Sequence, residues 1–127
     1  MQKGQVVRAK TSDLIWQETQ HQRLFELLDE LESGLDLQRA LQFLRHYAEE
    51  HFALEEAYME AVKFPGRDAH VRAHDKFREQ FRELEPTTGE EDEERQIIAM
   101  FLREWLSRHI YGTDKILEAF ILSTELR

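Results

Sequence analysis

Residues 37–66 read LQRALQFLRHYAEEHFALEEAYMEAVKFPG, and this stretch decides the fold. Its apolar residues recur at intervals of three and four, which is typical of a helix with one buried face. Asp36 precedes the stretch as a candidate N-cap, and the Pro65-Gly66 pair predicts that the helix ends near Phe64. The predicted buried face consists of Leu41, Leu44, Ala48, His51, Glu55, Tyr58 and Val62.

Two further helical patterns flank this stretch. One runs from about residue 17 to residue 33, and Gly34 is a plausible stop because glycine tolerates a left-handed backbone at a helix C-terminus. The other runs from about residue 68 to residue 84 and places His70 and His74 on its apolar face.

A fourth pattern begins near Gly89, where Thr88 and Glu91 have the spacing of a capping box. Helical character continues to about Thr124, and Gly112 is a place where it could be interrupted. The final pattern therefore predicts one long helix or two short ones in line.

Residues 1–15 lack a helical period and look like an irregular N-terminal arm. Four amphipathic helices with short connections close as an up-down-up-down bundle. We therefore predict an all-α fold, a four-helix bundle over residues 17–124 that carries this arm, as a single domain over residues 1–127.

Composition excludes several classes of function. The chain has 127 residues, a formal net charge of -9 and no cysteine. The charge argues against nucleic acid as a partner, and no apolar run is long enough for stable membrane insertion. Residues 1–10 lack the apolar core of a signal peptide, so we expect a cytoplasmic protein. Without thiolates, any metal must be bound by His, Asp or Glu.

Histidines occupy the apolar faces of all four predicted helices: His21, His51, His70, His74 and His109. One histidine on such a face is usually a hydrogen-bonded core residue. Five imidazoles in a dry core need more partners than these faces supply, and a cation would pair with all of them at once. The sixth, His46, lies off the apolar face, and we interpret it as a surface residue.

The spacing of these residues favours a metal site. His51 and Glu55 are four residues apart, so they project from one face of a helix, and His70 and His74 repeat that spacing. His109 and Asp114 are five apart and would diverge by about 140° on a regular helix. Either the helix is loosened locally near Gly112, or Asp114 reaches back across the site.

The ligand count favours two ions. Five imidazoles and two carboxylates are too many for one tetrahedral zinc ion, and they suit two octahedral ions. If both carboxylates and one oxygen atom bridge the pair, one coordination position stays open. Such a pair suits iron and a small ligand.

At this point the ordered motifs resemble the bacterial hemerythrins over about residues 18–117. The matching stretches are Gln20-His21 with Leu24-Phe25, His51 to Glu56 with Met59, Phe64-Pro65 before His70, His74 and Phe77, and Trp105-Leu106 before His109-Ile110 and Asp114.

The resemblance implies a di-iron centre with a bridging oxo or hydroxo group inside the bundle. By motif, His70, His74 and His109 would hold the coordinatively full iron, His21 and His51 would hold the iron with the vacancy, and Glu55 and Asp114 would bridge. It also implies a dioxygen pocket whose wall consists of Phe52, Met59, Trp105, Leu106 and Ile110.

The chain departs from the family pattern at its N-terminus. The family usually has Asp three residues before the first histidine, where this chain has Glu18. The residues of the arm also depart from the usual pattern. Glu18 and His21 form one Glu-x-x-His pair, but ferritin-like di-iron enzymes need two such pairs, so that family fits poorly.

The resemblance implies reversible dioxygen binding by an oxygen carrier, store or supplier that is not an enzyme. Two alternatives stay open. The first is an oxygen, redox or nitric oxide sensor that acts through a partner, and the second is a di-iron peroxidase or nitric oxide reductase. An oxygen-using enzyme or a signalling protein would be the recipient, and the absence of a leftover apolar stripe favours a monomer.

Overall fold

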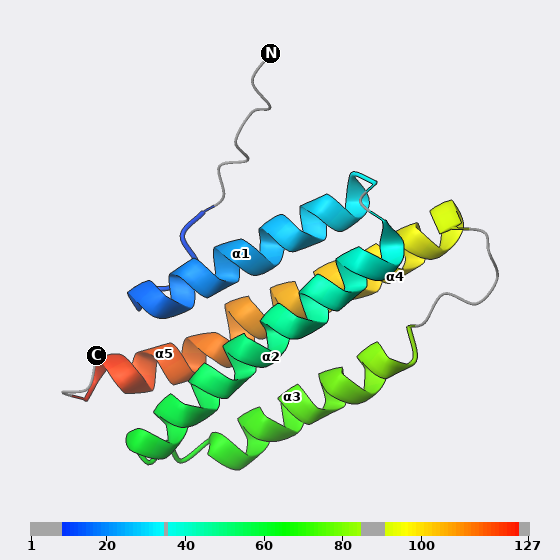
Figure 1. Cartoon of the computed structure of the whole chain (residues 1–127). Coiled ribbons are helices and arrows are strands. Elements are labelled where there is room, and N and C mark those ends of the chain that lie inside the picture. The colour runs from blue at the N-terminus through cyan, green and yellow to red at the C-terminus, as the bar shows by residue number, and fades with distance from the viewer. Residues whose placement is uncertain (1–8, 35, 85–90, 125–127) are drawn as a thin grey trace.

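The computed structural model describes residues 9–34, 36–84 and 91–124, and these residues form a four-helix bundle (Figure 1). The helices run alternately up and down, and the fourth rod of the bundle is built from three successive segments. The elements are α1 (Ile15–Glu32), α2 (Leu37–Ala61), α3 (Arg67–Arg82), α4 (Glu91–Arg108), the π-helical segment η1 (His109–Thr113) and α5 (Asp114–Leu122).

The helix ends agree closely with the sequence signals. Gly34 follows α1 with a positive φ of 108°, which glycine adopts without strain. The Asp36 side chain accepts a hydrogen bond from the Arg39 backbone N–H at 3.1 Å, which confirms the predicted N-cap of α2. At the N-terminus, α1 begins at Ile15, inside the stretch assigned to the irregular arm. The side chains of the predicted capping box, Thr88 and Glu91, lie outside the described part of the chain.

Helix α2 ends at Ala61, earlier than the prediction of Phe64. A Schellman motif ends the helix before Pro65 is reached. Lys63 adopts a left-handed φ of 54°, and the Phe64 N–H bonds back to the Met59 carbonyl at 2.9 Å. Met59 and Phe64 also belong to one apolar cluster, which is the side-chain contact that accompanies this motif.

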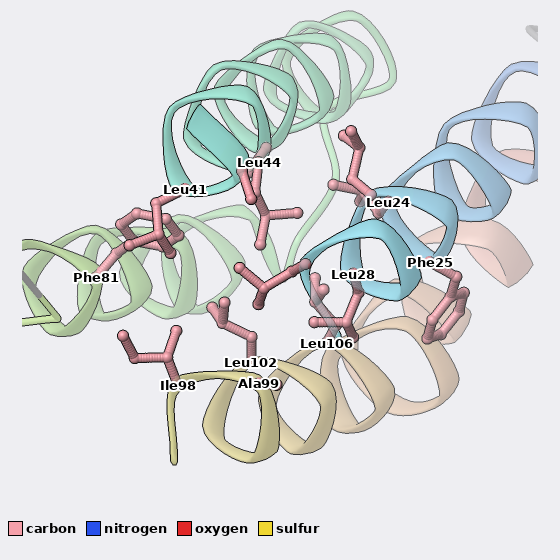
Figure 2. Packing of buried hydrophobic residues seen from close by; sticks show 14 of the residues in the cluster. Leu24, Phe25, Leu28, Leu41, Leu44, Phe81, Ile98, Ala99, Leu102 and Leu106 are labelled. Atoms are coloured by element: carbon pink, nitrogen blue, oxygen red, sulfur yellow. The ribbon is translucent and has the colours of Figure 1, made fainter. Parts of the chain in front are cut away.

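The apolar core forms two clusters along the bundle. Figure 2 shows part of the larger one, where Leu28, Leu44 and Leu102 point into the space between the helices. The smaller cluster contains Met59 and Leu117. On α2, the buried Glu55 lies between Phe52 of the larger cluster and Met59 of the smaller one, so a polar side chain separates the two apolar clusters.

Some large apolar side chains remain on the surface. Ile97 and Met100 lie three residues apart on α4, and their exposed fractions are 67% and 73%. Two such side chains do not amount to a leftover apolar stripe, and the monomer stays a prediction. Among the described residues, no helix is long and apolar enough to cross a membrane.

The fourth rod contains a π-helical segment around Gly112. At this place the sequence left open whether the helix is loosened or Asp114 reaches back across the site. Over His109–Thr113 the backbone hydrogen bonds span five residues instead of four. The Asp114 N–H accordingly bonds to the His109 carbonyl, and residues five apart return to one face. Local loosening near Gly112, the first of the two alternatives, is therefore confirmed.

A one-residue deletion tests this interpretation of η1. Deleting Gly112 should restore a regular α-helix in which His109 and Asp114 are four apart and still share a face. A Cβ at Gly112 would meet no atom within 4 Å, so no packing is lost with it. We expect helical content, by circular dichroism, and bound metal per chain to stay at wild-type levels.

An insertion at the same place should have the opposite effect. An alanine added after Gly112 rotates Asp114 by about 100° relative to His109, so metal binding should fall while the bundle stays helical. Loss of metal in the deletion variant would contradict this account of η1.

Candidate metal centre

All seven predicted ligands meet inside the bundle, and all are nearly inaccessible to solvent. They come from every helical rod: His21 on α1, His51 and Glu55 on α2, His70 and His74 on α3, His109 on η1 and Asp114 at the start of α5. The structure therefore brings together all seven residues that the sequence singled out, and their role as ligands stays a prediction. The sixth histidine, His46, has a 76% exposed side chain and pairs with Glu50, which confirms its surface position.

Potential ligand atoms form two groups, and within each group they lie within 4.8 Å of one another. One group takes His70, His74 and His109, and the other takes His21 and His51. Both groups contain Glu55 and Asp114. The two carboxylates therefore stand between two adjacent positions for a cation.

Asp114 turns one oxygen towards each group. Its Oδ2 atom lies 2.8 Å from His21 Nε2, and its Oδ1 atom lies 2.9 Å from His109 Nε2. Glu55 is arranged in the same way, with Oε1 lying 3.1 Å from His74 Nε2 and Oε2 lying 3.4 Å from His51 Nε2. This is the placement that a bridging carboxylate needs.

Three of the imidazoles are oriented by hydrogen bonds at Nδ1, while their Nε2 atoms face the other members of the cluster. The partner of His51 is Gln20 Oε1 at 2.7 Å, and the partner of His74 is Glu56 Oε2 at 2.8 Å. Both partner oxygens are acceptors, so Nδ1 donates and, in the neutral ring, Nε2 presents a lone pair to the centre. His21 has a comparable contact with Thr11.

These tautomers leave the centre short of positive charge. His74 Nε2, as a lone pair, would face the negatively charged Glu55 Oε1 at 3.1 Å with no proton between them. Asp114 Oδ1 is buried and makes no hydrogen bond of good geometry among the described residues. Cations at the two positions would satisfy both atoms, so the donor set fits metal binding.

In the absence of a metal, protons supply part of the missing charge. Burial favours the neutral acids, but the surrounding imidazoles outweigh burial and hold the pKa values of Glu55 and Asp114 below their usual range. Burial likewise disfavours a charged His109, yet the charge of Asp114 raises the pKa of His109 to about 9. The pKa of His70 is raised for the same reason, by Asp114 and Glu55.

Aromatic rings stack on two of the candidate ligand imidazoles. Phe52 stacks on His74 with ring centroids 3.9 Å apart, and Trp105 stacks on His109 at 4.6 Å. A surface groove of about 460 Å³ between α3 and α4 is lined by Trp105 and His109. Both rings therefore border this groove, although His109 is only 4% exposed.

The five predicted pocket-wall residues do not all lie together. Phe52, Leu106 and Ile110 are buried in the larger apolar cluster, and Trp105 packs against it. Met59 belongs to the smaller cluster, about one turn of α2 beyond Glu55. Their place in the wall of a dioxygen pocket stays a prediction.

Sequence reasoning missed four polar residues that hold the ligands: Thr11, Gln17, Gln20 and Glu56. Gln17 is completely buried and donates a hydrogen bond from Nε2 to Glu55 Oε2 at 2.9 Å. A signal existed for Gln17, because it lies four residues before His21 on the same face of α1. Thr11 lies outside any periodic pattern, so the sequence held no comparable signal for it.

Comparisons with known proteins agree with this centre. The sequence model of the Hemerythrin HHE cation binding domain matches residues 15–121. A hemerythrin-like protein of Naegleria gruberi is 32% identical over 95 residues, which cover 75% of this chain and 74% of that protein. A bacteriohemerythrin of Stenotrophomonas maltophilia is 31% identical over 120 residues, which cover 80% of this chain and 77% of that one.

A myohemerythrin of Theromyzon tessulatum is 28% identical over 95 residues, which cover 75% of this chain and 74% of the relative. No solved structure matches the chain with statistical significance. The family match spans all four rods and every member of the candidate centre. The chain therefore belongs to the hemerythrin family.

Proposed function

We propose that this protein binds dioxygen reversibly at two iron ions and serves as an oxygen carrier, store or supplier. The observation that carries the proposal is the pair of ligand groups that share Glu55 and Asp114 in a buried, aromatic-lined interior. Imidazoles and carboxylates with this arrangement suit a pair of iron ions better than one tetrahedral ion.

The two groups would hold their ions unequally. His70, His74 and His109 would supply three imidazoles to one iron, whereas His21 and His51 would supply two to the other. With the same bridging carboxylates, the second iron has room for one more small ligand. When bound, the reduced iron pair supplies the electrons that dioxygen binding requires and recovers them on release.

The protein's own contribution is to hold the ligands and exclude water. Phe52 and Leu106 are each 1% exposed, and the half-buried Trp105 stacks on His109 beside the groove. An apolar surrounding keeps out the water and protons that would otherwise release reduced oxygen and leave the irons oxidised.

A binding role is preferred to catalysis because the polar side chains described around the centre are already engaged. Gln20 and Glu56 each hold an imidazole, and Gln17 holds Glu55. We therefore propose that the protein is not an enzyme.

The direct test is an iron count with visible spectra. The purified protein should contain about two irons per chain. The reduced form should gain a visible absorption band in air and lose it under vacuum. A protein with iron that shows no reversible band would contradict dioxygen binding, and a protein without iron would contradict the metal centre as well.

Removal of one ligand tests the assignment of the residues. His74→Ala should lower both iron content and melting temperature, because the metal joins the helices and its binding adds to the free energy of folding. His46→Ala is the matched control and should change neither quantity. Iron loss in the control, or none in His74→Ala, would overturn the ligand assignment.

Metal affinity should depend on pH in a definite direction. The pKa of His109 is about 9 in the metal-free protein, so iron must displace a proton at neutral pH. The apparent affinity for Fe²⁺ should therefore rise by about tenfold per pH unit, for each proton displaced, between pH 7 and pH 8. Anaerobic titration with Fe²⁺ measures this slope, and an affinity independent of pH would be the contrary result.

A further inference from the structure

The end of the N-terminal arm is buried against the metal centre. Thr11 and Ser12 are 1% and 2% exposed, whereas the flanking Lys10 and Asp13 side chains are largely exposed. Burial of two hydroxyl residues in an irregular segment is costly unless their polar atoms are bonded. The hydrogen bonds of Thr11 show what the segment is held to.

Thr11 stands between a carboxylate and a candidate ligand. Its backbone N–H donates to Glu18 Oε1 at 2.8 Å, and its hydroxyl Oγ1 donates to the same oxygen at 2.5 Å. The hydroxyl also lies 2.9 Å from His21 Nδ1. Because the only hydroxyl proton points to Glu18, the Thr11 oxygen must accept from His21 Nδ1–H.

Other hydrogen bonds fix the arm in this position. The Ser12 hydroxyl donates to Gln17 Oε1 at 2.7 Å, and Gln17 in turn donates to Glu55. The Asp13 N–H donates to Glu118 Oε2 at 2.8 Å, which ties the arm to α5. The Thr11 hydroxyl is therefore held in place independently of its own contact with His21.

We propose that Thr11 is a positioning residue for the metal centre, and that its hydroxyl holds the His21 ring as the Nδ1–H tautomer with Nε2 aimed at the iron. The inference rests on the proposed role of His21 as an iron ligand. Glu18 stands where the chain departs from the family pattern, and its carboxylate reaches His21 through the hydroxyl of Thr11.

The arrangement has two consequences for the iron held by His21 and His51. First, an oriented ring loses iron more slowly, and loss of such an outer hydrogen bond commonly weakens metal binding by about 10–100-fold. Second, the negative charge of Glu18, passed on through Thr11, makes His21 a more basic ligand. A more basic ligand favours the oxidised iron, so the reduction potential is lowered.

Thr11→Val tests the proposal because valine has nearly the same shape as threonine but has no hydroxyl. With a chelator in excess, wild-type protein should release its two irons in separate phases. Thr11→Val should accelerate the first phase by about 10–100-fold and leave the second unchanged. Thr11→Ser keeps the hydroxyl and should restore the wild-type rate.

Thr19→Val is the matched control, since Thr19 is an exposed threonine on α1 whose hydroxyl donates to the Ile15 carbonyl. It should leave iron release unchanged. Glu18→Gln keeps an acceptor oxygen for Thr11 and removes the charge. Both Thr11→Val and Glu18→Gln should raise the reduction potential of the centre, and Thr11→Ser and Thr19→Val should not.

The outcomes separate this proposal from the proposed function. Wild-type protein with two irons and a reversible dioxygen band supports the function whatever Thr11 does. Wild-type release rates and potential in Thr11→Val would overturn the role of Thr11, as would a Thr11→Ser variant as impaired as Thr11→Val. If Thr11→Val fails to fold, an unchanged potential in Glu18→Gln would overturn it instead.

Discussion

Two negative charges buried in an apolar bundle are the constraint on which this structure depends. Glu55 and Asp114 are 0% and 1% exposed, and ionised carboxylates at such depth need positive partners. Five imidazoles surround them and lower the pKa values of both carboxyl groups, which favours the ionised form. The helices are therefore joined by charge at their middle and by apolar contacts towards both ends.

The order of the elements follows from that constraint. The two carboxylates can face both ligand groups only if α2 and the fourth rod carry them to the same depth in the bundle. On α2 the regular spacing of His51 and Glu55 suffices. On the fourth rod the spacing of His109 and Asp114 is one residue too long, and η1 absorbs the excess without turning the helix away.

Sequence patterns predicted the fold and the metal cluster because both are periodic. A histidine on an apolar face, such as His21 or His74, stands out against the residues that surround it. Asp114 was selected from its position five residues after His109, on the expectation that the helix is loosened near Gly112, and the resemblance added its bridging role. The pattern placed the end of α2 too late, because the residue that ends it, Lys63, has no preference for a left-handed backbone. The buried arm was missed because the hydrogen bonds of Thr11 involve residues without any common period.

The stacking of Trp105 on His109 places a fluorescent side chain next to the candidate metal centre. The indole lies 4.6 Å from an imidazole that faces the metal positions, and its other edge lines the surface groove. A coloured metal ion so close to an indole quenches its emission. If the centre holds iron as proposed, the chain's own ultraviolet fluorescence would report how full it is, without a label.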